Sequence, residues 1–348
     1  MISETLNYNL SNHNTFGLHC VCNRWLEYSS TEELKRIMSE VDGSRYFHIG
    51  SGGNVILPPH LDMLVLHSTN IFVDINRASK GGVRIKAGAG AKLDDIIDAC
   101  CHCGVWGFEN LSLIPGEAGA SVVQNVGAYG VEIADLVEKV ECYDVERNCI
   151  TSLSKDECMF GYRDSLFKSY KKRFIVTSVT YRLPSSGKPN LEYGNIRDIV
   201  ARRHKHLTPA EVRKEIIALR RSKLPDVETI GSAGSFFKNP VISTNRLNEL
   251  TKTVKAQDPA IDHIPSYKTT DNAVKIPAAW LIDQCGLKGK IFGNVAVWNK
   301  QPLVLVNNTG HATYDEIKNV SQFIVDTVYS IFGIKLTLEV EFIENCKH

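Results

Sequence analysis

The hydrophobic pattern of this chain changes its period at Gly333. Before that glycine, apolar residues recur at helical spacing, and a capping box of Thr313 and Glu316 marks where the helix begins. After it, apolar residues from Ile334 to Phe342 alternate with polar ones, which is the pattern of a half-buried strand. A chain that carries both periods so close together has to pack helices against a sheet.

Helices and strands are mixed along the rest of the chain without regular alternation. Further capping boxes pair Ser30 with Glu33, Ser154 with Glu157 and Thr208 with Glu211, and the last predicts a helix over residues 209–222. Strand-like runs occupy residues 47–49, 71–75, 83–87, 137–143, 174–183 and 303–306. The irregular order favours an α+β fold over a doubly wound sheet. Breaks near residues 58–59, 184–189 and 333 indicate three units.

Size and charge exclude several classes of protein. The 348 residues, 43% of them hydrophobic, are enough for two or three cores. Forty basic and 39 acidic residues leave a formal charge of +1, so no overall field favours nucleic acid or an anionic membrane. Residues 1–14 lack an apolar signal-peptide core, and no stretch approaches the roughly 20 apolar residues of a membrane span. We expect a cytoplasmic protein without nucleic-acid partners or membrane insertion.

The cluster from Cys100 to Cys103, with His102, suggests zinc at first sight. Its context argues against a metal, because residues 92–103 carry a helical apolar stripe that includes Cys100, and no second ligand pair follows. We interpret these thiols as structural and expect no metal site. Ten scattered cysteines in such a chain are typical of a reducing compartment.

Three glycine-bearing loops could approach a phosphate. Gly88-Ala89-Gly90 resembles the start of a dinucleotide fingerprint, but Leu93 stands at the third glycine, which argues against that site. Residues 50–54 follow a strand, and a second loop begins at 115–121 and continues to 130. Either of these two could be a tight turn or a nest of backbone amides for an anion. The presence of both favours a large cofactor with a diphosphate.

Ser235 stands in the run 234–240, between a glycine and two phenylalanines. A nucleophilic serine needs an adjacent base, and the nearest histidines, His206 and His263, are remote in sequence. Taken alone, the segment fits a turn serine beside core rings, and it also fits a serine that passes a proton in a dry pocket.

The order of motifs along nearly the whole chain resembles the UDP-N-acetylenolpyruvoylglucosamine reductase family. The most specific motifs are Gly-Tyr-Arg-Asp-Ser at 161–165 and Gly-Ser-Phe-Phe-Lys-Asn-Pro at 234–240. The others lie at residues 14–17, 50–54, 109–130, 223–226 and 278–283. The segment 245–271, with Tyr267, is similar to the tyrosine-bearing substrate loop of the longer form of the family.

The resemblance implies a flavoenzyme of peptidoglycan precursor synthesis. FAD, bound without a covalent bond, would take hydride from NADPH and give it to the enolpyruvyl ether of UDP-N-acetylglucosamine-enolpyruvate, producing UDP-N-acetylmuramate. The implied fold is a vanillyl-alcohol-oxidase-like FAD-binding module in two parts with a C-terminal α+β substrate domain. We place the borders at 1–62, joined by 333–348, at 63–200 and at 205–332, and we expect a monomer.

The resemblance also implies roles for single residues. Arg163 would stabilise an enolate, Glu339 would donate a hydrogen bond to it when protonated, and Ser235 would deliver the proton. Substrate-binding positions would be Tyr129, Tyr193, Lys223, Asn239, Tyr267 and Gln301. Cofactor-binding positions would be Gly50, Ser51, Gly52, Gly53, Asn54, Pro115, Gly116, Gly119, Ala120, Ser121, Gln124, Asn125 and Gly127.

Three positions depart from the family pattern. Gly53 replaces a common serine and removes one hydroxyl donor. Glu117 stands where a small residue is usual, so it would crowd or charge the second loop. Thr337-Leu338-Glu339 replaces a frequent Glu-Pro-Glu and keeps only the second acid.

Two other functions are compatible with a flavin fold. One is a related oxidase of a small alcohol or sugar, which would form peroxide without any UDP-sugar. The other is a sensor without catalytic activity, which would bind the UDP-sugar and consume no NADPH. Lys223, Tyr267 and the proton-donor serine argue against the oxidase, which would not need them. The presence of Arg163, Ser235 and Glu339 together argues against the sensor.

Overall fold

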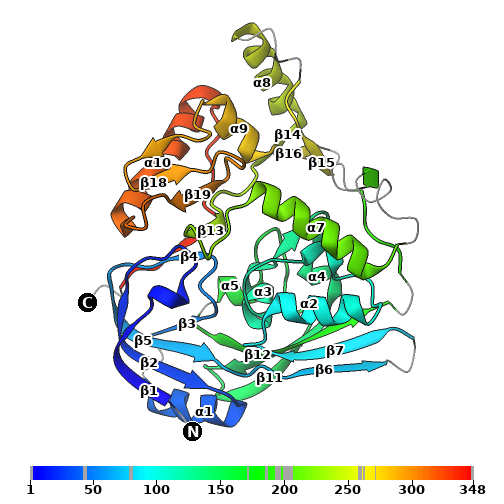
Figure 1. Cartoon of the computed structure of the whole chain (residues 1–348), viewed down its shortest axis with the longest axis vertical. Helices are drawn as coiled ribbons and strands as arrows, with labels where there is room; N and C mark the ends of the chain where they lie inside the picture. Colours follow the sequence, from blue (N-terminus) through cyan, green and yellow to red (C-terminus); the bar gives the residue numbers. More distant parts are fainter. Residues whose placement is uncertain are drawn as a thin grey trace.

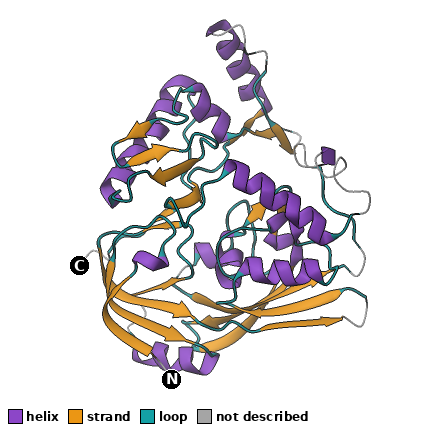
Figure 2. Cartoon of the chain, in the orientation of Figure 1, coloured by secondary structure: helices purple, strands orange, loops and turns teal. Residues whose placement is uncertain are grey.

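The computed structural model in Figures 1 and 2 gives the fold of most of the chain. The described residues are 3–41, 45–77, 81–170, 172–184, 187–192, 197–198, 207–257, 261, 263–270 and 272–345. Helices and strands are mixed throughout them, which confirms the predicted α+β fold. No helix among these residues is long and apolar enough to cross a membrane.

The first part of the chain forms a four-stranded mixed sheet with the order β1-β2-β5-β3. Its strands are β1 (Ser3–Asn9), β2 (Val21–Tyr28), β3 (Tyr46–Ile49) and β5 (His60–Ser68). A short 3-10 helix, η1 (Ser11–His13), joins β1 to β2, and α1 (Thr31–Glu40) follows β2. Trp25 and Val65 lie on the face that packs with Ile343 from the end of the chain.

The second part is a five-stranded antiparallel sheet with the order β11-β10-β12-β7-β6. Its strands are β6 (Val73–Arg77), β7 (Val83–Gly88), β10 (Val137–Asp144), β11 (Cys149–Ser154) and β12 (Phe174–Leu183). Figure 1 shows its helices gathered over one face of this sheet. They are α2 (Leu93–His102), η2 (Glu109–Leu111), α3 (Ala118–Gln124), α4 (Ile133–Leu136), α5 (Leu166–Ser169) and α7 (Pro209–Lys223). A short hairpin of β8 (Gly127–Ala128) and β9 (Val131–Glu132) precedes α4.

The third part contains a four-stranded sheet with the order β13-β19-β18-β17. Its elements are β13 (Ser232–Ser235), α9 (Ala278–Gln284), β17 (Ile291–Phe292), β18 (Val295–Val297), β19 (Val304–Asn307) and α10 (Tyr314–Phe332). A separate sheet of β14 (Val241–Ser243), β15 (Tyr267–Thr270) and β16 (Ala273–Lys275), with α8 (Thr244–Gln257), projects at the top of Figure 1.

The C-terminal segment connects the third part with the first. Ile334, Leu336 and Val340 pack into the core of the third part. Directly after Val340, β20 (Glu341–Phe342) pairs in parallel with β4 (Val55–Ile56), which follows the first glycine loop. The C-terminal segment therefore meets the first part of the chain beside that loop, while the domain borders given above stay a prediction.

Most predicted elements are confirmed. Helices α7 and α10 begin at the capping boxes of Thr208 and Thr313, and α10 ends at Gly333, whose φ of 63° is left-handed. The strand predicted over 174–183 is β12 with the same bounds, and β3, β7, β10 and β19 agree within a residue or so. The apolar stripe of residues 92–103 is also confirmed, because Cys100 and Cys101 are buried in α2.

Two predictions about elements are wrong. Ser154 and Glu157 do exchange both capping hydrogen bonds, yet they close a turn after β11, because Met159 adopts a left-handed φ of 48° that ends the coil. The strand predicted over 334–342 shows the expected alternation of buried and exposed residues, but only 341–342 pair as a strand. The preceding residues cross between two cores and form only isolated backbone pairings in the described part of the chain, such as the bridge between Phe237 and Leu338.

Candidate active site

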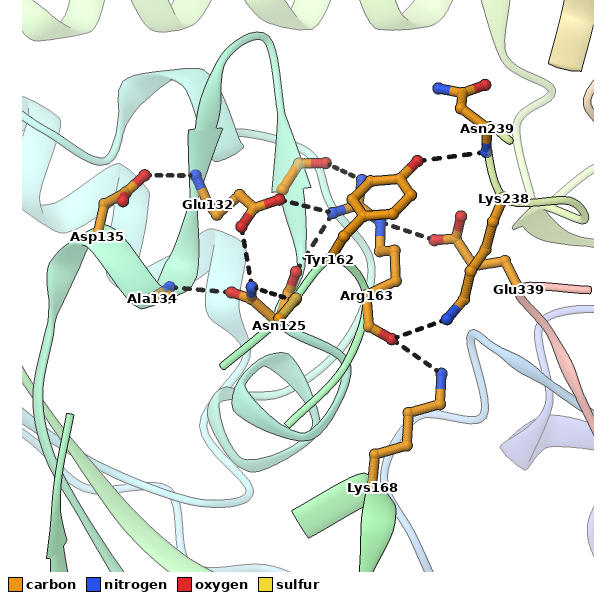
Figure 3. A network of polar contacts seen from close by, with 12 residues as sticks. Asn125, Glu132, Ala134, Asp135, Tyr162, Arg163, Lys168, Lys238, Asn239 and Glu339 are labelled. Atoms are coloured by element: carbon orange, nitrogen blue, oxygen red, sulfur yellow. Dashed lines mark hydrogen bonds and ion pairs between the residues drawn. The ribbon is translucent and has the colours of Figure 1, made fainter. Parts of the chain in front are cut away.

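Arg163 lies at the centre of a polar network between the second and third parts of the chain (Figure 3). Its φ of 54° is left-handed, and a bridge between Gly161 and Asp164 closes the turn that carries it. The guanidinium donates from Nη2 to the carbonyl of Gly127 at 2.7 Å and from Nη1 to the carbonyl of Asn125 at 3.3 Å. These bonds fix the plane of the guanidinium before any substrate is present.

Asn125 supports this arrangement from the end of α3. It caps the helix with a left-handed φ of 45°, a conformation that asparagine tolerates better than most residues. Its amide nitrogen donates to the Glu132 carboxylate at 2.9 Å and to the carbonyl of Gly161 at 2.8 Å, and its oxygen accepts from the amide of Ala134 at 3.1 Å. Asn125 therefore ties the turn of Arg163 to the β8-β9 hairpin, and a contact with the cofactor stays a prediction.

Glu339 approaches Arg163 from the C-terminal segment. Its Oε1 accepts from Arg163 Nε at 2.9 Å, and its side chain is 12% exposed. The Glu339 amide donates to the carbonyl of Phe236 at 2.9 Å, and its carbonyl accepts from the Asn54 side chain at 3.2 Å. Burial raises the pKa of Glu339, while the charges of Arg163 and Lys168 act in the opposite direction.

Two lysines converge on the backbone of Arg163. Lys168 Nζ donates to its carbonyl at 3.3 Å and to the side-chain oxygen of Gln124 at 2.6 Å, and Lys238 Nζ donates to the same carbonyl at 3.4 Å. Burial lowers the pKa of Lys168, and the charge of Lys238 adds to this effect. Sequence analysis gave neither lysine a role, although Lys238 lies inside the motif around Ser235.

Tyr162 was also missed, and it joins the same two parts of the chain. Its hydroxyl accepts from the amide of Asn239 at 3.4 Å, and Lys275 Nζ lies 3.8 Å from its ring centroid. A cation at that distance over an aromatic ring is attracted to the face of the ring. The signal was available in the sequence, since Tyr162 stands next to Arg163 in the most specific motif.

Ser235 is the last residue of β13, opposite Val304 of β19. Gly234 before it has a left-handed φ of 70°, and Phe236 and Phe237 after it are buried. Within the part of the chain that the structure describes, the half-buried Ser235 hydroxyl has no hydrogen-bond partner. The carbonyl of Phe236, the residue after Ser235, accepts from the Glu339 amide. The backbone at Ser235 therefore lies beside the segment of Glu339.

The predicted substrate residues are placed at different distances from this centre. Asn239 belongs to it, and its side-chain oxygen accepts from the amide of Ala278 at 2.9 Å. Gln301 precedes β19, and its side-chain oxygen is buried without a partner among the described residues. Tyr129 follows β8 and is half-buried, Lys223 is exposed at the end of α7, and Tyr267 is 53% exposed in β15. Tyr193 lies outside the described residues.

The two predicted cofactor loops lie against each other. A Cβ on Gly53 would be 3.7 Å from the carbonyl of Pro115, and one on Gly50 would be 3.3 Å from the Cβ of Ala120. Gly52 has a left-handed φ of 65°, and a side chain there would collide with the backbone of His13. Small residues thus let the backbones of the two loops approach each other closely.

The third glycine-bearing loop, residues 88–90, contacts other parts of the protein instead. Side chains at Gly88 and Gly90 would collide with the backbone of Asn70 and Ser68. Ala89, between them, accepts from the amide of Gly119 at 2.9 Å. This turn therefore supports the start of α3 beneath the second loop.

Comparison with known proteins agrees with this geometry. The family model of the UDP-N-acetylenolpyruvoylglucosamine reductase C-terminal domain matches residues 225–343, and the FAD binding domain model matches residues 25–148. A crystal structure of UDP-N-acetylenolpyruvylglucosamine reductase from Thermus caldophilus superposes with a TM-score of 0.66 at 23% identity over 98% of both chains. The predicted FAD-binding module of the vanillyl-alcohol-oxidase-like type is thereby confirmed.

Two curated relatives carry the same name over nearly their full length. The UDP-N-acetylenolpyruvoylglucosamine reductase of Bacteroides fragilis strain YCH46 is 40% identical over 97% of this chain and 99% of its own. That of Neisseria gonorrhoeae is 39% identical over 95% of this chain and 94% of its own. The chain therefore belongs to the UDP-N-acetylenolpyruvoylglucosamine reductase family and is an oxidoreductase with an FAD-binding domain.

Proposed function

We propose that this enzyme reduces the enolpyruvyl group of UDP-N-acetylglucosamine-enolpyruvate to give UDP-N-acetylmuramate for peptidoglycan synthesis, with NADPH as reductant. The observation that supports this most is the contact of Arg163 with Glu339 beside the segment of Ser235. An enolate needs one group to stabilise its charge and another to protonate it. The guanidinium of Arg163 suits the first task, and the hydroxyl of Ser235 suits the second. A cytoplasmic, monomeric enzyme belongs to the same proposal.

FAD supplies the hydride when it is bound. The residues that would hold it are those of the two loops, Gly50, Ser51, Gly52, Gly53, Asn54, Pro115, Gly116, Gly119, Ala120, Ser121, Gln124, Asn125 and Gly127. NADPH would supply this hydride to the flavin, and the sugar nucleotide would accept it at the terminal carbon of its enolpyruvyl group.

Arg163 would bind the substrate carboxylate and the negative charge that spreads into it. A guanidinium carries five N–H donors, and the bonds to Gly127, Asn125 and Glu339 use three of them. Two donors are not used by these bonds, the Glu132 carboxylate lies 3.9 Å from Nη1, and the orientation of the group is already fixed. A preorganised charge of this kind stabilises a transition state without a cost of reorientation.

Glu339 would act as a neutral acid. Burial raises its pKa, so its protonated form persists to a higher pH than that of a free carboxyl. In that form it can donate a hydrogen bond to the enolate oxygen, while its other oxygen accepts from Arg163. An ionised Glu339 would instead repel the developing negative charge.

Ser235 would deliver the proton that completes the reaction. Its hydroxyl has no partner among the described residues, and the buried rings that follow it exclude water from one side. Asn239, Gln301, Tyr129, Lys223, Tyr267 and Tyr193 are proposed to bind the rest of the substrate. Among them, Lys223 and Tyr267 suit the diphosphate, since they offer a cation and a hydroxyl donor.

The test follows the flavin through both halves of the reaction in a stopped-flow instrument without oxygen. NADPH should bleach the yellow enzyme, and the enolpyruvyl sugar nucleotide should then restore its colour with formation of UDP-N-acetylmuramate. A colourless protein that does not take up FAD would contradict the proposal. So would reoxidation that requires oxygen and forms peroxide, or binding of the UDP-sugar without consumption of NADPH.

A further inference from the structure

Glu117 is a buried acid between the two cofactor loops. It is 7% exposed and precedes α3, in the second loop. Its Oε1 accepts from the hydroxyl of Ser51 in the first loop at 2.9 Å. A Cβ on Gly50 would lie 3.0 Å from its Oε2, so the carboxylate packs directly against the first loop. The acid that breaks the family pattern therefore joins the two loops across their contact.

His67 in β5 contacts the residue that precedes the first loop. Its Nδ1 lies 3.1 Å from the carbonyl of Ile49, the residue before Gly50. His67 also stacks on Trp25, with ring centroids 5.3 Å apart. The first loop is thus contacted by a buried carboxyl group, and an imidazole contacts the residue before it.

The surroundings of Glu117 act on its charge in both directions. Burial raises its pKa, and His67, the Ser51 hydroxyl and Lys92 act in the opposite direction. Lys92 is exposed. The pKa of the neighbouring Tyr28 in β2 is raised by burial and, to a smaller extent, by the charge of Glu117. A diphosphate placed on these loops would bring additional negative charge close to this carboxylate.

We propose that Glu117 joins the two loops through Ser51 and takes up a proton from solvent when FAD binds, so that affinity for the flavin falls as pH rises. The inference rests on the proposal that these loops hold the FAD. A protonated carboxyl removes the repulsion between Glu117 and the diphosphate, and it still accepts from the Ser51 hydroxyl through its carbonyl oxygen.

The sign follows from linkage. If the bound state carries more protons than the free state, raising the pH favours dissociation, and log Kd rises with pH by the number of protons taken up. One proton gives a slope of up to +1, which is about a tenfold loss of affinity per pH unit. FAD itself has no group that titrates near neutrality, so a slope there belongs to the protein.

The experiment is equilibrium dialysis of the full-length holoenzyme against a series of FAD concentrations between about pH 5.5 and pH 9. The wild type should show Kd rising with pH. Glu117→Gln keeps the size of the side chain and an acceptor for Ser51 without titrating, so its Kd should be nearly independent of pH. Its affinity at high pH should exceed that of the wild type.

Two further variants separate the possible sources of a slope. Ser51→Ala should bind FAD more weakly and keep the slope, because the acid remains. His67→Gln should also keep it, since the proton is assigned to Glu117. A slope that survives in Glu117→Gln and disappears in His67→Gln would overturn the proposal, and so would a wild-type Kd independent of pH. If Gly52→Ala retained FAD normally, the cofactor loops themselves would be misassigned, which is a different failure.

Discussion

Arg163 and Glu339 make a hydrogen-bonded ion pair of 2.9 Å although 176 positions of sequence separate them. The pair connects the turn at 161–164 with the C-terminal segment, and both side chains are largely buried. Lys168 and Lys238 both contact the Arg163 carbonyl, and a second carboxylate, Glu132, lies 3.9 Å from the same guanidinium. This arrangement makes the protonation of Glu339 the natural variable to test.

Changing Glu339 should alter the pH dependence of the second half-reaction. Because burial raises its pKa, the donor form is present at low pH and is lost as pH rises through that pKa, so flavin reoxidation by the sugar nucleotide should slow with rising pH. Glu339→Gln keeps an N–H donor and should abolish the decline. Glu339→Ala should reduce the rate by roughly 10²–10⁴. Glu341→Gln, on the same segment, is the control that should keep the wild-type profile.

Ser235→Ala should separate the two half-reactions. We expect flavin reduction by NADPH to be unchanged and reoxidation by the substrate to slow by roughly 10²–10⁴, since only the second step needs the proton. Stopped-flow absorbance of the flavin measures both rates in one preparation. Ser232→Ala, on the same strand, is the control for damage to β13. Unchanged reoxidation in Ser235→Ala would mean that another group protonates the enolate.

Gly52 and Gly53 offer a matched pair of substitutions in one loop. Gly52→Ala places a side chain against the backbone of His13 at a left-handed φ of 65°, so the loop should distort and FAD should be lost during purification. Gly53→Ala meets only ordinary contacts, 3.7 Å from the carbonyl of Pro115, and should retain flavin. The ratio of flavin to protein absorbance measures the outcome. Equal retention in both variants would contradict the role given to this loop.

Arg213 should contribute strongly to stability because it fastens α7 to α2. Its guanidinium donates to both oxygens of Asp94, at 2.6 and 3.0 Å, and to Asp98 at 2.8 Å, and the side chain is 10% exposed. Arg213→Ala leaves Asp94 without its guanidinium partner and should lower the free energy of unfolding by about 3 kcal/mol.

The control for Arg213 is an exposed pair of similar length. Arg24 contacts Glu4 at 2.8 Å, and both side chains are more than 40% exposed. Arg24→Ala should cost less than about 1 kcal/mol, because solvent screens such a pair. Urea unfolding at a fixed FAD concentration compares the two variants. Similar losses in both would show that burial does not strengthen the Arg213 contacts.

Elements whose pattern extends over many residues, or whose ends carry a boundary signal, could be predicted from sequence. Elements fixed by tertiary contacts could not. Helix α10 repeats its pattern over five turns between a capping box and a glycine, and β12 is ten residues of continuous strand pattern. By contrast, β4 and β20 have two residues each and no readable period. The segment 334–342 carries the alternation of a strand, but its backbone partners lie in two different cores, which alternation does not reveal.

Some residues of the candidate site could be identified from the sequence, and others only from the structure. Resemblance singled out Arg163, Ser235 and Glu339, and the structure places Arg163 against Glu339 and Ser235 beside the segment of Glu339; their roles stay proposals. The convergence of Lys168 and Lys238 on one carbonyl was not predictable, because it depends on the left-handed φ of Arg163. Few non-glycine residues adopt that conformation, and only the surrounding structure specifies where.

The pairing of β20 with β4 has a consequence for the order in which a growing chain can assemble this site. Arg163 leaves the ribosome 176 residues before Glu339, which at about 5–20 residues per second is a delay of roughly 10 to 35 seconds. During that time both glycine loops are already synthesised, whereas the acid opposite Arg163 does not yet exist. A ribosome that stalls shortly before residue 339 would therefore hold a chain with both cofactor loops complete and Arg163 still without its carboxylate partner.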